Sequence, residues 1–192
     1  MKPMAYQMLK YRAIACLVFG RNAPAASIFN QMLERWPDDV YALSSRSHLH
    51  AQAGRHAQAL QDSARLTALD TANGRVWFNH GFLLEEAGRW DEALVAFQRA
   101  TELAPQLDRA WYGLGLVLIR VGRQDEAIAA LKRNTELQPM SPYGWYQLAR
   151  VHADRHEPEA VVKIIRHLKG FEPKVAAQLE RETGLHAGAS AA

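Results

Sequence analysis

The residues best suited to chemistry in this sequence are its eight histidines, which could bind a metal ion or transfer protons. His48 and His50 are two residues apart, so on a helix they point in different directions and cannot share one ion. His152 and His156 are four residues apart with Asp154 between them, but no third ligand stands in a suitable place. We therefore expect structural histidines and no metal site.

Other catalytic and cofactor-binding patterns are also missing from the sequence. It contains no glycine-rich nucleotide loop, no nucleophile elbow and no pair of acids in a recognisable catalytic setting. Its single cysteine, Cys16, excludes an internal disulfide. Acidic and basic residues nearly balance, with a net charge of +3, so no polyanion-binding tract is indicated. We expect no enzymatic activity and no cofactor.

The glycines follow a regular interval that predicts the fold. Four Gly-Arg pairs recur at intervals of 34 residues, beginning at Gly20, Gly54, Gly88 and Gly122. Trp77 and Trp111 keep the same interval. Self-similarity at a period of this size indicates a solenoid of repeated units, which offers a long surface to a partner.

Two of these units share a packing pattern as well as a length. They read Trp77-x2-His80-Gly81-x2-Leu84…Ala93-x3-Phe97…Pro105 and Trp111-x2-Leu114-Gly115-x2-Leu118…Ala127-x3-Leu131…Pro139. The pattern resembles the tetratricopeptide repeat, a helix–turn–helix unit in which small residues let two helices approach and large residues fill the space beside them. The resemblance implies an all-α fold, a right-handed superhelical solenoid of antiparallel helix pairs.

Extending this frame in both directions predicts a single solenoid over residues 1–184. Its five repeats are expected at about residues 6–39, 40–73, 74–107, 108–141 and 142–173. The fifth repeat lacks the turn glycine and, judged from Glu159-Ala160, is one residue short, which leaves its turn geometry open. Residues 174–183 are expected to form a capping helix, and residues 185–192 a flexible tail.

The N-terminal sequence does not fit a secretion signal. Lys10 and Arg12 interrupt the region where an uninterrupted apolar stretch should begin. No apolar segment approaches the length of a membrane span. These features predict a cytoplasmic protein that does not enter a membrane.

In the tetratricopeptide family, the first helix of each repeat lines a concave groove through the second, fifth, ninth and twelfth residues of the unit. The resemblance therefore implies a peptide-binding face on the first helices. Its candidate residues are Lys10, Tyr41, His48, Arg75, Phe78, Phe82, Arg109, Tyr112, Leu116, Arg120, Tyr143, Tyr146 and Arg150.

Aromatic rings and arginines dominate this face, and both residue types contribute strongly to binding energy at protein interfaces. The alternative is that the rings pack on neighbouring helices and the arginines are solvated. The whole set favours a non-catalytic protein–protein interaction module, an adaptor, scaffold or assembly factor that holds a peptide or helix of a partner. Because arginine bonds carboxylates, the partner segment is expected to carry acidic and apolar residues.

Two other functions stay open at this point. Related helical-repeat arrays read single-stranded RNA, and rings beside arginines could stack bases. However, those arrays lack this packing pattern and lysine is sparse on the face, so a nucleic acid is the less favoured partner. The other function is that of a chaperone for secreted substrates, as some short tetratricopeptide proteins are.

The first predicted helix, about residues 3–19, is apolar almost all round. An end repeat should present a polar outer surface because no neighbour covers it, and exposed apolar patches often mark interfaces. We expect this helix to dock onto another chain, either a second copy in a homodimer or the functional partner. The alternative is that Met4, Met8 and Tyr11 fold back onto the second helix of their own repeat.

Overall fold

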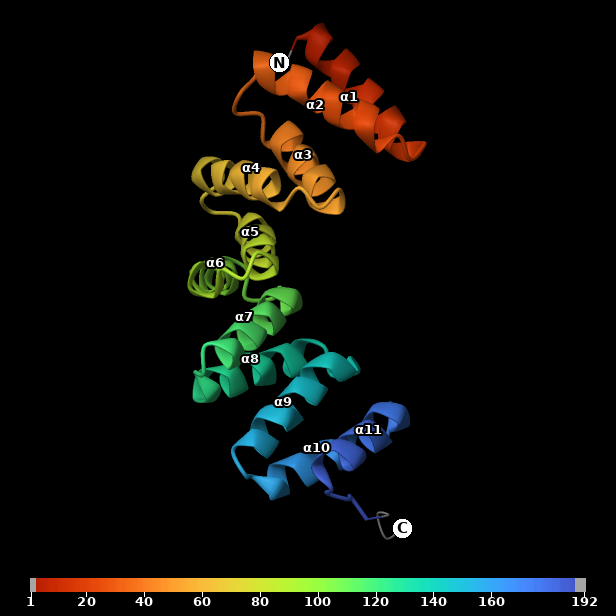
Figure 1. Cartoon of the computed structure of the whole chain (residues 1–192), viewed down its shortest axis with the longest axis vertical. Coiled ribbons are helices and arrows are strands. Elements are labelled where there is room, and N and C mark those ends of the chain that lie inside the picture. Colours follow the sequence, from red (N-terminus) through yellow and green to blue (C-terminus); the bar gives the residue numbers. More distant parts are fainter. Residues whose placement is uncertain (1–2, 189–192) are drawn as a thin grey trace. The chain divides into compact units, whose positions relative to one another are not determined.

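The computed structural model describes residues 3–188, and within that range the chain forms eleven α-helices and no strand (Figure 1). They are α1 (Met4–Val18), α2 (Asn22–Arg35), α3 (Val40–Gln52), α4 (His56–Leu69), α5 (Gly74–Glu86), α6 (Trp90–Leu103), α7 (Asp108–Arg120), α8 (Gln124–Leu137), α9 (Pro142–Asp154), α10 (Pro158–Lys169) and α11 (Pro173–Thr183). The predicted all-α repeat fold is confirmed.

The chain divides into two compact units, Met1–Arg89 with α1 to α5 and Trp90–Ala192 with α6 to α11. In the first unit α1 packs on α2 and α3 on α4, and in the second α7 packs on α8 and α9 on α10. The third predicted repeat, residues 74–107, is shared between the units, with α5 in one and α6 in the other. These helices account for about five repeats, and α11 is the additional helix predicted after them.

Four of the turns between consecutive helices contain a glycine in the left-handed conformation, which glycine adopts without a Cβ clash. The φ angles of Gly20, Gly54, Gly88 and Gly122 are 66°, 70°, 71° and 78°. The amide of the arginine that follows donates to a carbonyl of the last helical turn, as Arg123 does to Leu118 at 2.9 Å. This bond satisfies a helix-end carbonyl and closes the turn.

The fifth turn keeps this geometry with a histidine in place of glycine. His156 has φ 58°, and among residues 3–188 it is the only residue other than glycine with a positive φ. The Glu157 amide donates to the His152 carbonyl at 2.9 Å, which is the bond that closes the other turns.

The 34-residue register also continues beyond this turn, so the expected loss of one residue before Glu159-Ala160 is corrected. Helix α10 begins at Pro158, 34 residues after the start of α8 at Gln124. Val161 and Ile165 are fully buried, as are Ala127 and Leu131 at the matching positions. The fifth repeat therefore carries a larger residue, Val161, where the other repeats carry alanine.

Small residues allow the helices of the second unit to approach closely. A Cβ atom on Gly115 would lie 2.7 Å from side-chain atoms of Leu131, and one on Gly113 would lie 2.7 Å from the ring of Phe97. Such distances are shorter than real Cβ contacts, so a larger residue would force the helices apart.

The repeated tryptophans are held by one recurring hydrogen bond. The indole nitrogens donate to carbonyls six residues earlier, Trp77 to Thr71 at 3.0 Å, Trp111 to Pro105 at 3.0 Å and Trp145 to Pro139 at 2.9 Å. Because the acceptor is a backbone carbonyl, Thr71 can replace the proline of the other repeats without loss of this bond.

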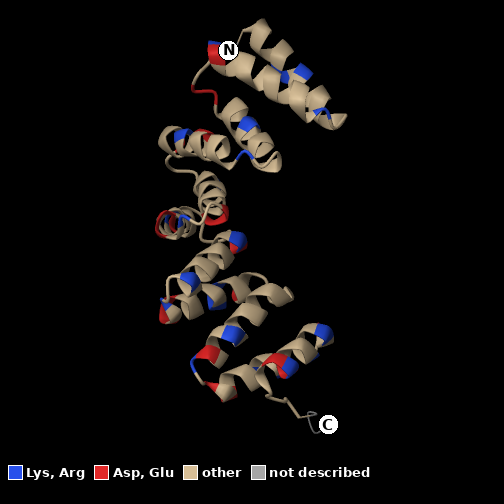
Figure 2. Ribbon diagram, viewed as in Figure 1, with Lys and Arg blue, Asp and Glu red and all other residues tan. Residues whose placement is uncertain are grey.

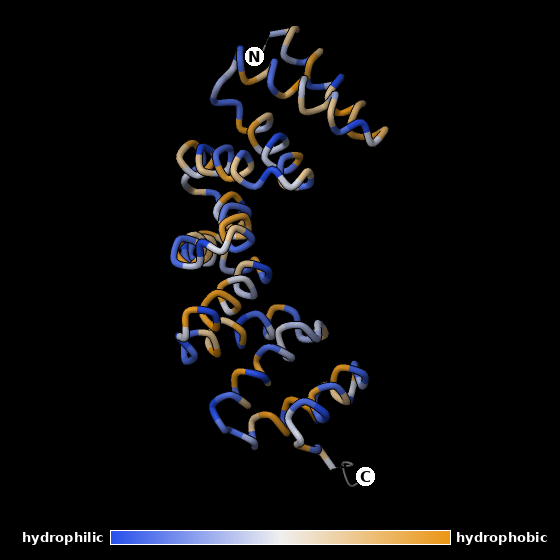
Figure 3. The backbone as a smooth tube through the Cα atoms, viewed as in Figure 1, coloured by the Kyte–Doolittle hydropathy of each residue, from blue (hydrophilic) through white to orange (hydrophobic). Residues whose placement is uncertain are grey.

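Each unit buries its own apolar residues. Tyr6, Phe29 and Met32 belong to the core of the first unit, and Leu148, Ile165 and Leu179 to that of the second. Charged residues of both signs are spread along the helices of both units (Figure 2), and hydrophobic and hydrophilic residues alternate within the helices (Figure 3). None of the helices in the described range combines the length and the apolar character needed to cross a lipid bilayer.

The chain after α11 is partly held in place. Lys169 Nζ donates to the Ala187 carbonyl at 2.6 Å, and the Ala187 amide donates to Glu180 Oε1 at 3.1 Å. Ala187 is buried against the core of the second unit. Within the tail predicted to be flexible, residues 185–188 thus contact α10 and α11, and residues 189–192 lie outside the described part of the chain.

Candidate peptide-binding face

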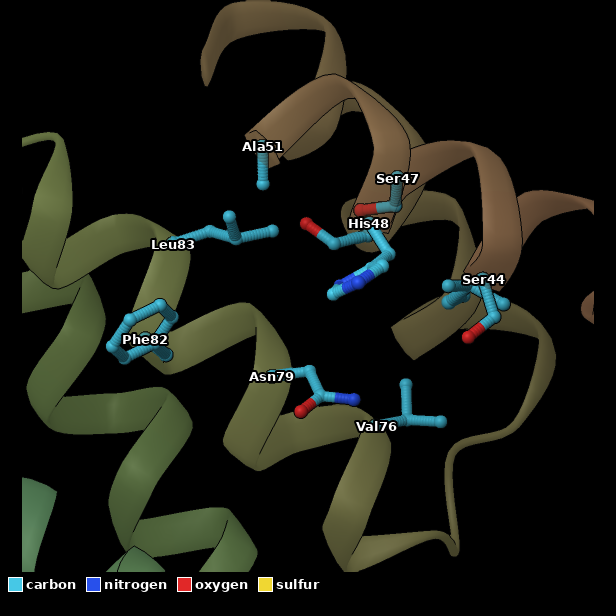
Figure 4. A pocket seen from close by; sticks show the side chains of 10 residues that line it. Ser44, Ser47, His48, Ala51, Val76, Asn79, Phe82 and Leu83 are labelled. Atoms are coloured by element: carbon cyan, nitrogen blue, oxygen red, sulfur yellow. The ribbon is translucent and has the colours of Figure 1, made fainter. Parts of the chain in front are cut away.

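The face of the first unit contains a cavity of about 250 Å³ between α3 and α5. Two of the predicted residues, His48 and Phe82, line it, and His48 of α3 and Asn79 of α5 point into the space between the two helices (Figure 4). Ala51, Val76 and Leu83 add apolar surface. The cavity therefore combines an apolar lining with polar groups on both facing helices.

Three polar groups in this cavity are exposed: the side chains of Ser44, His48 and Asn79. Ser47 also lines the cavity, but its hydroxyl donates to the Ala59 carbonyl at 2.9 Å. Exposed hydroxyl, imidazole and amide groups can bond the backbone of a bound peptide, because each can act as donor or acceptor.

Other predicted residues of the first unit lie outside this cavity. Lys10 Nζ lies 4.5 Å from the centre of the Tyr41 ring, so these two residues form a cation–π pair. Arg75 and Phe78 belong to α5 but do not line the cavity. The structure thus separates the six predicted residues of this unit into a cavity pair, a cation–π pair and two further α5 residues.

The face of the second unit contains a larger cavity, of about 470 Å³, in which three predicted tyrosines come together. Tyr112 comes from α7, and Tyr143 and Tyr146 come from α9. The Tyr143 side chain is 70% exposed, so its ring is available to a ligand. Gln147 and residues of α11 complete the lining.

Tyr146 is fixed by the last helix. Its hydroxyl lies 2.8 Å and 2.9 Å from the two carboxylate oxygens of Glu182, and Gln178 Nε2 donates to Glu182 Oε1 at 2.8 Å. The Arg150 guanidinium lies 5.9 Å from the centre of the Tyr146 ring.

This cluster shifts the pKa of both of its acidic groups. Burial, followed by the hydrogen bond to Glu182, raises the pKa of the Tyr146 phenol above its ordinary value. Hydrogen bonds from Gln178 and Tyr146 lower the pKa of the Glu182 carboxyl, and the charge of Arg150 acts in the same direction. The second unit therefore already holds one carboxylate beside a tyrosine and an arginine.

The remaining predicted residues of this unit lie outside its cavity. The Arg120 guanidinium lies 5.2 Å from the centre of the Trp90 ring, and Leu116 is half-buried. Arg109 and Arg150 also lie outside the lining. The arginine–aromatic pairs at Arg120 and Arg150 combine the residue types expected on this face. They do not form a single continuous site.

Sequence reasoning missed the contribution of α11, which was expected only to cap the array. Val175 and Gln178 of α11 line the tyrosine cavity, together with Glu172 immediately before the helix. The one available signal was the four-residue spacing of Gln178 and Glu182, which places both on one side of a helix. Asn79 of the first unit was not named as a candidate either, because it is not the second, fifth, ninth or twelfth residue of its repeat.

Two histidines have hydrogen-bond partners within the chain. His152 Nδ1 lies 2.5 Å from Glu157 Oε2, and His80 Nδ1 lies 2.8 Å from the Ser63 hydroxyl. The hydrogen bond from His152, followed by that from Arg155, lowers the pKa of Glu157. No three histidine, cysteine or acidic side chains of residues 3–188 come together as a metal site.

Paired helices with small residues at their contacts define a helical-repeat protein. The tetratricopeptide repeat family model matches residues 12–73 and 78–142, more than half of the chain. The chain belongs to the tetratricopeptide repeat family. Proteins of this family bind protein or peptide partners, generally as non-catalytic scaffolds.

Solved structures agree with this fold. MamA 41-end from Desulfovibrio magneticus RS-1 is 17% identical, with 95% of this chain and 98% of that chain covered and a TM-score of 0.80. A tetratricopeptide repeat protein from Parabacteroides merdae ATCC 43184 is 18% identical, with coverage of 95% and 75% and a TM-score of 0.83. YrrB, described as a protein with an unusual peptide-binding site, is 19% identical, with 88% of both chains covered and a TM-score of 0.78. No curated protein sequence matches the chain.

Proposed function

We propose that this chain is a non-catalytic adaptor or scaffold that binds a peptide or helix of a partner on the face of its first helices. The observation that carries this proposal is the cavity lined by Tyr112, Tyr143 and Tyr146. Tyrosine offers a large contact area together with a hydroxyl, which makes it a frequent anchor at interfaces. YrrB, which shares the fold and is described as having a peptide-binding site, supports a peptide as the ligand of this chain.

The partner segment carries an acidic residue next to an apolar one. Glu182 supports this chemistry, because a carboxylate of the chain itself already bonds the Tyr146 hydroxyl close to Arg150. An acidic side chain of the partner can pair with an arginine of this face, while the apolar residue next to it contacts the tyrosine rings.

The test uses the full chain with a photoreactive phenylalanine derivative in place of Tyr143. The matched control places the same group at Val95 of α6, which is 61% exposed and lies outside the tyrosine cavity. A partner that crosslinks from position 143 and not from position 95 is purified, and its affinity is measured with Tyr112→Ala. We expect binding to weaken about tenfold. Normal binding by Tyr112→Ala would refute the proposed face.

RNA is the alternative ligand in the same experiment. An RNA partner would crosslink from position 143 and lose affinity steeply as salt rises, since its phosphates release counterions on binding.

A cytoplasmic location remains our proposal from the N-terminal sequence, where Lys10 and Arg12 interrupt the apolar run.

We further propose that α1 docks onto α1 of a second copy. Met4, Met8 and Tyr11 are 88%, 57% and 67% exposed, so they do not fold back onto their own repeat. A symmetric contact between the apolar α1 helices of two copies covers these exposed side chains.

Sedimentation at micromolar concentration tests this contact. The wild-type chain is expected to form a dimer. The variant that combines Met4→Lys with Met8→Glu is expected to remain a monomer. A wild-type chain that remains monomeric would refute self-association and leave the tyrosine face unaffected.

A further inference from the structure

A second cavity of the second unit shares no lining residue with the tyrosine cavity. It has a volume of about 460 Å³ and is lined by residues of α8, α9 and α10. Trp145, Leu148 and Ile164 supply apolar surface, and Lys132 and Lys163 add positive charge from α8 and α10. The volume lies in the range of small-ligand sites, so it exceeds what a bare ion needs.

The corresponding positions of the preceding repeat keep the apolar residues but not the charge. Trp111 and Leu114 stand 34 residues before Trp145 and Leu148. The polar positions differ: Gln98 corresponds to Lys132, Ala129 to Lys163 and Glu126 to Ala160. One acid is thus lost and two lysines are gained, whereas helix packing requires only the apolar residues that both repeats share.

The two lysines have no acidic partner within residues 3–188. None of the ion pairs of this range includes Lys132 or Lys163. The carboxylate of Glu136, which also lines the cavity, accepts from Arg133 at 2.8 Å. His152 is engaged by Glu157. Two exposed ammonium groups therefore remain beside an apolar surface.

We propose that this cavity binds a carboxylate joined to an apolar group, in the form of a partner segment with Glu or Asp beside Phe or Leu. The apolar side chain contacts Trp145 and Leu148, and the carboxylate lies between Lys132 and Lys163. Both lysines are exposed, so the polypeptide of the partner can continue beyond the cavity on either side. The site is independent of the tyrosine face, and two separate sites would let one copy hold two segments.

The test titrates the full chain with an N-acetylated, C-amidated Glu-Phe-Glu peptide and follows the Trp145 indole signal by NMR. We expect saturable binding that weakens at least about tenfold in Lys132→Gln combined with Lys163→Ala. These replacements restore the residues of the preceding repeat at exposed positions, so the fold is kept. The matched control, Lys174→Gln combined with Arg181→Gln, removes two charges from exposed positions of α11 outside the cavity and is expected to bind normally.

Several outcomes would overturn the proposal. They are unchanged binding by the lysine variant, an equal loss in the α11 control, and equal affinity for Gln-Phe-Gln. Binding of free N-acetylphenylalanine but not of the peptide would mean that the site takes a small acid, and this too contradicts the proposal. Tyr112→Ala leaves the Trp145 titration unchanged, so a failure here is distinguishable from a failure of the tyrosine face.

Discussion

The two units present different chemistry on equivalent helices. The cavity of the first unit is lined by small polar groups such as Ser44, His48 and Asn79, with Phe82 as its one aromatic ring. The cavity of the second unit is lined by three tyrosines and by residues of α11, the last helix of that unit. Repeats with one packing pattern therefore carry cavities with different linings.

From this difference we expect the two units to play different roles in the proposed binding. Aromatic rings contribute contact area, so most of the binding free energy is expected in the second unit. Exposed amide, imidazole and hydroxyl groups can hydrogen-bond the backbone of a bound segment. Such bonds fix the position of the segment more than they raise its affinity. Four experiments test whether the two units differ in this way.

The largest effect is expected from Gly115→Leu, which places a side chain against Leu131 in the second unit. A Cβ atom at this position already lies 2.7 Å from Leu131, so we expect overpacking to cost about 3 kcal/mol of unfolding free energy. Urea unfolding measures the loss and hydrogen exchange locates it. Exchange should accelerate in α7 to α9 and remain slow in α1 to α4, because repeats couple mainly to their neighbours.

The control for this experiment is Ala129→Leu, at an exposed position of α8, which should change stability little. Equal acceleration of exchange in both units after Gly115→Leu would show that they unfold together, and the comparison between them would lose its basis.

A smaller effect is expected when each cavity loses one side chain. Tyr112→Ala should weaken partner binding by about 1.4 kcal/mol, and His48→Ala by less than about 1 kcal/mol, because truncation of the tyrosine removes more contact area. Titration calorimetry with the purified partner measures both, and circular dichroism checks that helicity is retained. A greater loss for His48→Ala would reverse the proposed roles.

The turns allow a comparison of stability between repeats. His156→Gly should stabilise the protein by about 0.5–1 kcal/mol, because glycine removes the Cβ strain at φ 58° but loses more entropy on folding. Gly122→Ala, in the preceding turn, should destabilise by about 1 kcal/mol for the same reason. Thermal unfolding measures both changes. A destabilised His156→Gly variant would show that the histidine ring makes contacts that outweigh the strain.

The smallest effect is expected from replacing Glu182 of the second unit. The lining of the first cavity contains no carboxylate, so the first unit offers no equivalent group. The pKa of Glu182 is lowered in the folded protein, so its carboxylate stabilises the fold above the unfolded pKa, near 4.3. This contribution is lost as the pH falls through the lowered pKa. The melting temperature of wild type should therefore exceed that of Glu182→Gln at pH 7, and the difference should shrink below about pH 4.3. A difference that does not vary with pH would argue against the Tyr146–Glu182 bond.

The repeat architecture follows from the sequence because its determinants are local. The spacing of Gly20, Gly54, Gly88 and Gly122 sets the turns, and small residues such as Gly115 mark where paired helices touch. His156 shows where this reasoning stops. A residue other than glycine can adopt the same turn geometry at a cost in conformational strain. The pattern of residue types then no longer indicates the repeat register.

The binding surface depended on tertiary structure, since its members are far apart in the chain. Family positions named Tyr112, Tyr143 and Tyr146, but they did not indicate that these rings share one cavity or that α11 helps to line it. Burial of Ala176 and Leu179 in the core orients α11, and this orientation brings Gln178 and Glu182 to Tyr146. Sequence alone thus determined the repeated helix pair, whose contacts are between near neighbours, whereas packing of the whole unit decided which side chains meet.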